Sequence, residues 1–255
     1  MKNQFLSRFV FTLLCLAALA VTPMSACEPT TIPDSIAARL DQPIREVLHN
    51  LQWTGQASLR LVVGDKIVFI DPFNLTGTDS ADVVLITHSH GDHLSVADLK
   101  KVVTSQTKIV APAGCGQALA ENGFVVHRTV APGDSFTVDG VAVKVVPSYT
   151  ITKPTHPKAD NWVGYLIDVD GVMVYHPGDT QRIPEMKDIR CHIAFMPLGQ
   201  KYTMDTVDDA VQAILDIRPK LAIPFHYGMY EGTADDAVYF QKSLRDKGVE
   251  VIILK

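Results

Sequence analysis

Three tight turns, each between two runs typical of β-strands, restrict the possible folds of this chain more than any other feature. The turn residues are Gly64-Asp65, Asp139-Gly140 and Asp170-Gly171, and apolar residues dominate or alternate on both sides, as in "RLVVGDKIVF". Asp and Gly adopt the left-handed backbone conformations of two-residue hairpin turns, and strands joined by such turns are antiparallel. The chain is therefore predicted to contain antiparallel sheet.

Helical segments are interleaved with these strands. Apolar residues recur there with a period near 3.6. Start and stop signals mark four helical segments: one begins at Ser95, one ends at Gly123, one covers 206–217 and one covers 235–248. Between and after the last two lie the apolar runs 220–228 and 249–255. This order predicts an α/β protein in which helices cover mixed, mostly antiparallel sheets.

The segment "HSHGDH", residues 88–93, follows the apolar run "DVVLIT". Its three histidines and one aspartate would converge just past the end of a buried strand. Imidazole and carboxylate groups are the ligands that suit Zn²⁺ and its first-row neighbours. The helical H-E-x-x-H zinc motif does not fit, because Gly91 interrupts the segment. The segment predicts a metal site in a loop, and a histidine-rich surface loop is the alternative.

The segment resembles the H-x-H-x-D-H signature of the metallo-β-lactamase superfamily of metal-dependent hydrolases. The similarity extends from about Trp53 onward through "FIDPF", "PSYTITKPTHPK", "YHPGDT" and "IPFHYG". It is strongest to the branch that includes ascorbate phosphate lactonase-like and N-acyl-phosphatidylethanolamine phospholipase-like proteins. The resemblance implies a four-layer αβ/βα sandwich.

The resemblance also implies which residues hold metal. One metal would be surrounded by His88, His90 and His156, and a second by Asp92, His93 and His226, with Asp179 bridging both. Dedicated β-lactamases of this fold have a cysteine where this chain has Asp179, so the aspartate argues against that activity.

Two divalent cations, zinc first and manganese or iron as alternatives, would activate a shared water as hydroxide. Asp92, as the catalytic residue, would orient that hydroxide toward an ester, lactone, amide or phosphoester. Two other functions remain open: a metal-binding lipoprotein without catalysis, and an iron-dependent redox member of the same superfamily.

Four loop residues are expected to contact a small-molecule substrate: Tyr149, Lys153, Tyr202 and Thr203. Lys153 would hold an anionic group, or it is a plain surface lysine. Cys115 and Cys191 are free to pair, although their spacing does not require it. The net charge of −5 and the scattered basic residues argue against nucleic acid as a partner.

Residues 1–27 have the features of an export signal: Lys2 and Arg8 precede an apolar stretch that is too short to span a membrane with ease. A short membrane anchor is the alternative. The sequence "MSAC" resembles a bacterial lipobox, so the mature protein would be periplasmic after ordinary cleavage or attached to the membrane through a lipidated Cys27. We divide the chain into this signal, a linker with a short helix at 28–52, and a metallo-hydrolase domain at 53–255.

Overall fold

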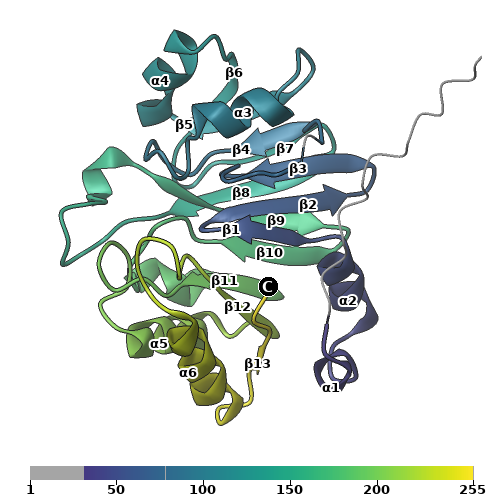
Figure 1. Cartoon of the computed structure of the whole chain (residues 1–255), viewed down its shortest axis with the longest axis vertical. Coiled ribbons are helices and arrows are strands. Elements are labelled where there is room, and N and C mark those ends of the chain that lie inside the picture. Colours follow the sequence, from purple (N-terminus) through teal and green to yellow (C-terminus); the bar gives the residue numbers. More distant parts are fainter. Residues whose placement is uncertain (1–31, 78, 255) are drawn as a thin grey trace, which may run out of the picture.

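The computed structural model describes residues 32–77 and 79–254, and the predicted export signal with Cys27 lies outside the described residues. Two β-sheets form the centre of the molecule (Figure 1). The strands of the first sheet follow one another in chain order: β1 (Gln52–Gly55), β2 (Ser58–Val63), β3 (Lys66–Ile70), β4 (Val83–Leu85), β5 (Lys108–Pro112) and β6 (Val126–Val130).

The second sheet also keeps the chain order of its strands. It contains β7 (Ser135–Val138), β8 (Val141–Pro147), β9 (Val163–Val169), β10 (Val172–His176), β11 (Ile193–Pro197), β12 (Leu221–Phe225) and β13 (Glu250–Val251). In both sheets the strands nearest the start are antiparallel and the later ones are parallel.

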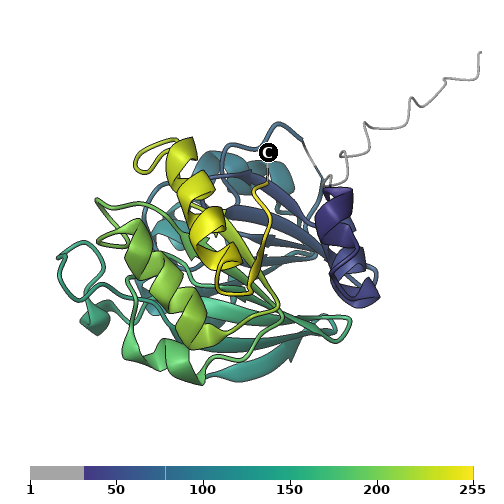
Figure 2. The ribbon, with the colours of Figure 1, turned by 90° about the horizontal axis from the view of Figure 1, so that it is seen from below.

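Four layers result from the packing of helices on the outer faces of the sheets. The helices are α3 (Val96–Val102) and α4 (Gly116–Glu121) on the first sheet, and α5 (Val207–Ile217) and α6 (Ala234–Arg245) on the second (Figure 1). Figure 2 shows α5 and α6 side by side on their sheet. Three separate apolar clusters fill the three spaces between the layers, the largest of them between the sheets. The predicted four-layer αβ/βα sandwich is confirmed.

The predicted hairpins are all present, as β2–β3, β7–β8 and β9–β10. The expectation of mostly antiparallel sheets needs correction, since among the described strands five neighbouring pairs are antiparallel and six are parallel. Hairpins carry a turn signal in the sequence, whereas parallel neighbours are joined through distant crossovers that leave no local signal.

The segment before the sheets holds two helices in place of the one expected, α1 (Asp34–Ala37) and α2 (Gln42–His49). Pro43 in the first turn of α2 suits a helix start, because proline has no N–H to donate there. Ile36 and Leu48 are buried in the central cluster, so these helices belong to the core of the sandwich. In the described part of the chain, no helix combines the length and the apolar character needed to cross a bilayer.

Candidate metal centre

The 88–93 segment turns sharply between β4 and α3. The backbone N–H groups of His93 and Leu94 both donate to the carbonyl of His90, which folds the segment back toward the strand. Ser95 then caps α3, as predicted, by accepting a hydrogen bond from the backbone N–H of Asp98. A strand end on one side and a capped helix on the other hold the segment rigid.

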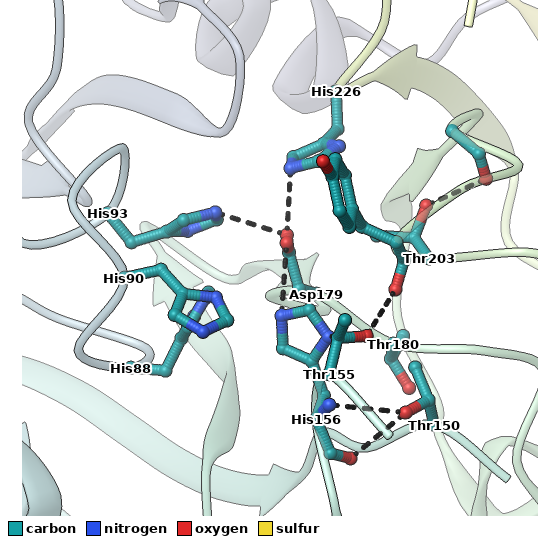
Figure 3. A network of polar contacts seen from close by, with 12 residues as sticks. His88, His90, His93, Thr150, Thr155, His156, Asp179, Thr180, Thr203 and His226 are labelled. Atoms are coloured by element: carbon teal, nitrogen blue, oxygen red, sulfur yellow. Dashed lines mark hydrogen bonds and ion pairs between the residues drawn. The ribbon is translucent and has the colours of Figure 1, made fainter. Parts of the chain in front are cut away.

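The residues predicted as metal ligands come together in two groups. The ligand atoms of His88, His90 and His156 lie within 4.8 Å of one another, and so do those of Asp92, His93 and His226. His156 comes from the loop after β8, and His226 is the first residue after β12. The sandwich thus gathers at one edge residues that are far apart in the chain (Figure 3).

Asp179 lies between the two groups, three residues after β10 (Figure 3). Its Oδ2 atom is 3.3 Å from Nε2 of His156, and its Oδ1 atom is 3.2 Å from Nε2 of His93 and 3.1 Å from Nε2 of His226. One oxygen therefore faces each group, which is the arrangement that a bridging carboxylate requires.

Gly178 is needed to place Asp179. Its φ is +64°, and a Cβ there would lie 2.9 Å from the carbonyl oxygen of Val163 and 3.2 Å from Cβ of Thr87. Only a glycine permits this turn to approach the end of β4 so closely. His176 fixes the same turn by accepting a hydrogen bond from the Gly178 N–H.

Four of the five candidate ligand rings, all except that of His90, are oriented through their Nδ1 atoms. The Asp71 carboxylate lies 2.7 Å from Nδ1 of His93 and accepts hydrogen bonds from the backbone and side chain of Thr87. Nδ1 of His226 lies 2.9 Å from Oε1 of Glu231. Hydroxyl groups lie against the Nδ1 atoms of the other two buried rings, Thr87 at 2.9 Å from His88 and Thr155 at 3.0 Å from His156. Such contacts fix the tautomer of a metal-binding histidine.

Backbone strain also concentrates here. Among the described non-glycine residues with left-handed backbone are Gln56 at φ 48°, Asp71 at 46° and His226 at 55°. Nε2 of Gln56 donates to Oδ2 of Asp92 at 2.9 Å, and the same atom lies 2.8 Å from Nε2 of His226. Strained conformations persist where the surrounding structure holds them in place, and here they aim side chains at the two ligand groups.

The donor atoms fit divalent cations. Nε2 of His93, Nε2 of His156 and Oδ1 of Asp179 are buried and lack a hydrogen bond of ordinary geometry, and such atoms are costly without a partner. Burial lowers the pKa of His88 well below its usual range and also lowers that of His90, so both rings are neutral and free to bind metal. Burial alone would raise the pKa of Asp179, but His226 and His93 outweigh it and hold that pKa well below the usual range. Five imidazole rings around an ionised carboxylate form a nitrogen and oxygen donor set that suits zinc, manganese or iron.

A cavity of about 600 Å³ opens beside the ligands. Of the four residues expected to contact substrate, Tyr202 lines it. Besides ligand residues, its wall contains Thr155, Lys201, Met229 and Tyr230, which we did not predict. Neighbours in an irregular loop point in different directions, and their sequence carries no period that would reveal which side faces the cavity.

The other three expected contacts lie elsewhere. Tyr149 is buried and its hydroxyl donates to Glu185. Thr203 is buried and its hydroxyl donates to the carbonyl of Gly199. Lys153 donates from Nζ to the carbonyls of three residues, Gln200, Thr203 and Met204. These groups are used internally, so all three residues support loops around the cavity.

Neither described cysteine adds to the site. Cys115 and Cys191 are both free thiols, so they are not paired with each other. Burial raises the pKa of each to about 12, so both remain protonated and unreactive at neutral pH.

A two-sheet sandwich with histidine and aspartate ligands at one edge defines a class, the metal-dependent hydrolases of the metallo-β-lactamase fold. The family model for the beta-lactamase superfamily domain matches residues 50–226. The chain therefore belongs to the metallo-β-lactamase superfamily, and it is a metal-dependent hydrolase.

Relatives agree with this assignment over most of the chain. A UPF0173 metal-dependent hydrolase of Thermococcus onnurineus is 33% identical over 219 residues, which cover 80% of this chain and 96% of the relative. Its counterpart in Archaeoglobus fulgidus is 33% identical over 229 residues, covering 80% and 95%. Among solved structures, a candidate metal-dependent hydrolase from Parabacteroides distasonis has a TM-score of 0.72 at 33% identity and covers 80% of this chain and 91% of its own.

Proposed function

We propose that the protein is an exported hydrolase with two metal ions, which acts on an ester, lactone, amide or phosphoester of a small molecule. The position of Asp179 is the observation that carries the proposal. Its two oxygens face different ligand groups at 3.1–3.3 Å. A site for a single ion does not require one carboxylate to face two separate ligand groups. Zinc is the expected metal.

The candidate ligands would form two metal-binding groups. His88, His90 and His156 would hold one cation, and Asp92, His93 and His226 the other. Bound there, the two ions would lower the pKa of a shared water toward about 7 and polarise the oxygen of the substrate.

Asp92 is placed to orient that water. It lines the cavity, and its Oδ2 is fixed by the hydrogen bond from Gln56, so Oδ1 is the atom available to hold a proton of the attacking water.

A panel of 4-nitrophenyl esters, lactones, amides and phosphodiesters tests this proposal. The wild-type protein should hydrolyse at least one class, lose that activity when a chelator removes the metals, and regain it with two equivalents of zinc. Asp92→Asn should abolish the activity and reduce bound metal. Full activity of Asp92→Asn on the same substrate would contradict the assignment.

A redox function at iron is the second candidate, because the diiron β-hydroxylase CmlA of Streptomyces venezuelae shares the fold with a TM-score of 0.65 at 16% identity. That likeness concerns the fold alone. Metal analysis of freshly purified protein separates the two: zinc or manganese supports hydrolysis, and iron with oxygen consumption would favour the redox function.

The cavity wall favours a substrate with an anionic group. Apart from the histidine ligands, Lys201 is the one basic residue among the described residues that line the cavity, and its ammonium lies 4.5 Å from the ring centroid of Tyr202. That contact holds the ammonium at the wall, where a carboxylate or phosphate could pair with it.

Export is supported by the basic and apolar residues of the first 27 positions. Fractionation of cells that express the full chain, with mass analysis of the mature N-terminus, tests it. A lipidated Cys27 would place the protein in the membrane fraction, and Cys27→Ala would release it. An intact N-terminus in the cytoplasm would contradict export.

A further inference from the structure

Glu231 is a buried carboxylate that was not predicted as part of the site. It makes four polar contacts, and they go to two different parts of the molecule. Oε1 lies 2.9 Å from Nδ1 of His226 and 3.2 Å from the hydroxyl of Thr203. Oε2 accepts hydrogen bonds from the backbone N–H groups of Lys201 at 2.9 Å and Tyr202 at 2.6 Å.

These partners join the metal centre to the cavity wall. His226 belongs to the second ligand group, and Lys201 and Tyr202 line the cavity. Figure 3 shows Thr203 on the same side of the site as His226. One carboxylate thus orients a ligand ring and fixes the loop that would contact substrate.

The fold makes room for this carboxylate at Gly199. A Cβ on that residue would lie 1.7 Å from both Cδ and Oε1 of Glu231. Gly199 is not among the residues with positive φ, so its backbone accepts an alanine. The requirement for glycine at this position comes from the closeness of Glu231 alone.

Lys153 holds the same loop from its carbonyl side. Its ammonium donates to the carbonyls of Gln200, Thr203 and Met204 at 2.5–3.0 Å, whereas Glu231 accepts from the N–H groups. Opposite charges on the two sides of one backbone segment fix its position. Of these two charged residues, Glu231 reaches both the loop and a candidate metal ligand, whereas the ammonium of Lys153 contacts the loop and Asp205.

We propose that Glu231 is a positioning residue that couples the metal ligand His226 to the cavity wall at Lys201 and Tyr202. A metal bound at His226 fixes that ring, the ring fixes Glu231, and Glu231 fixes the wall. Because such coupling is reciprocal, an occupied cavity also strengthens metal binding at the second ligand group. The inference rests on the proposed function, since it requires metal at His226.

Calorimetric titration of the metal-free protein with Zn²⁺ gives a readout that needs no substrate. In Glu231→Gln, one of the two side-chain oxygens that accept hydrogen bonds is replaced by an amide group that donates them. The amide therefore cannot keep all the contacts of the carboxylate. We expect one of the two zinc affinities, that of the group with His226, to fall by ~10–100-fold and the other to change little. Gly199→Ala should reproduce this loss, since it displaces the same carboxylate without altering it.

Two control variants separate coupling from simple destabilisation. Asp98 is also buried and accepts two backbone hydrogen bonds, from Asn74 and Leu75, but it lies in α3. Asp98→Asn should lower the melting temperature and leave both zinc affinities within about twofold of wild type. Lys153→Met should raise KM for the substrate found by the panel and leave zinc affinity unchanged, whereas Glu231→Gln should alter both.

The outcomes distinguish this inference from the proposed function. If the wild-type protein binds fewer than two zinc ions, both fail. If wild type and Glu231→Gln bind two ions with equal affinity, the coupling fails and the proposed function stands. An equal loss of zinc affinity in Asp98→Asn would likewise overturn the coupling, because it would show a general effect of instability.

Discussion

The two sheets contribute to the candidate metal centre in different ways. The first sheet supplies four candidate ligands from one segment, residues 88–93, between a strand and a capped helix. The second sheet supplies His156, Asp179 and His226 from three separate loops. The first half of the site, residues 88–93, is thus determined by local sequence. The second half, the three loop residues of the second sheet, comes together only when the whole sheet has formed. This difference predicts which substitutions should impair one half of the site alone and which should impair both.

The largest effect is expected from Asp179→Ala, because its two carboxylate oxygens face the two ligand groups. Its loss removes the bridging position and leaves the surrounding rings without their carboxylate. Hydrolysis should fall by roughly 1000-fold or more and both metal ions should bind weakly. His88→Ala and His226→Ala serve as comparisons, since each should retain about one metal ion per chain. Two ions in Asp179→Ala would show that the two ligand groups do not share a ligand.

Asp71→Asn tests the support of the first half. The carboxylate of Asp71 is fully buried between His93 and Thr87, and its replacement leaves Nδ1 of His93 without an ionised partner. Metal affinity should fall by ~10–100-fold, measured by competition with a chelating dye. Unchanged affinity would mean that the 88–93 segment alone orients its rings.

A pair of glycines compares the backbones of the two halves. A Cβ at Gly178 would meet backbone at 2.9 Å in a residue with φ +64°, whereas a Cβ at Gly91 would meet nothing within 4 Å. Gly178→Ala should therefore lower the free energy of unfolding by ~1–3 kcal/mol or more, and Gly91→Ala should change it by less than about 0.5 kcal/mol. Urea denaturation measures both, and equal losses would refute the difference in packing.

The smallest effect is expected at the cavity wall. Lys201→Met should raise KM by ~2–5-fold for substrates with a carboxylate or phosphate and leave matched neutral substrates unaffected, since the ammonium is exposed. Steady-state kinetics with one anionic and one neutral substrate of the same bond type gives the answer. Equal changes in both would assign Lys201 no role in recognition.

The same contrast explains what the sequence could reveal. The hairpins and the 88–93 segment are local patterns, so their residues could be identified before the structure was known. His156, Asp179 and His226 were found through the resemblance to a family, because nothing in their spacing shows that three strand ends meet.

The residues of the cavity wall could be identified neither from a local sequence pattern nor from the resemblance to a family. Lys201 and Tyr202 face the cavity, but Thr203, the next residue, is buried behind them. Lys153 looked suited to an anion, and the sequence gives no sign that three carbonyl groups surround its ammonium. Such roles depend on contacts between distant loops, and these exist only in the folded chain.

The most direct test of two ligand groups around one bridging carboxylate is the metal content of active protein that lacks residues 1–27. Metal-free protein should be inactive, and activity should rise with added zinc until two ions are bound per chain. A maximum of activity at one ion per chain, with no further binding, would contradict the account.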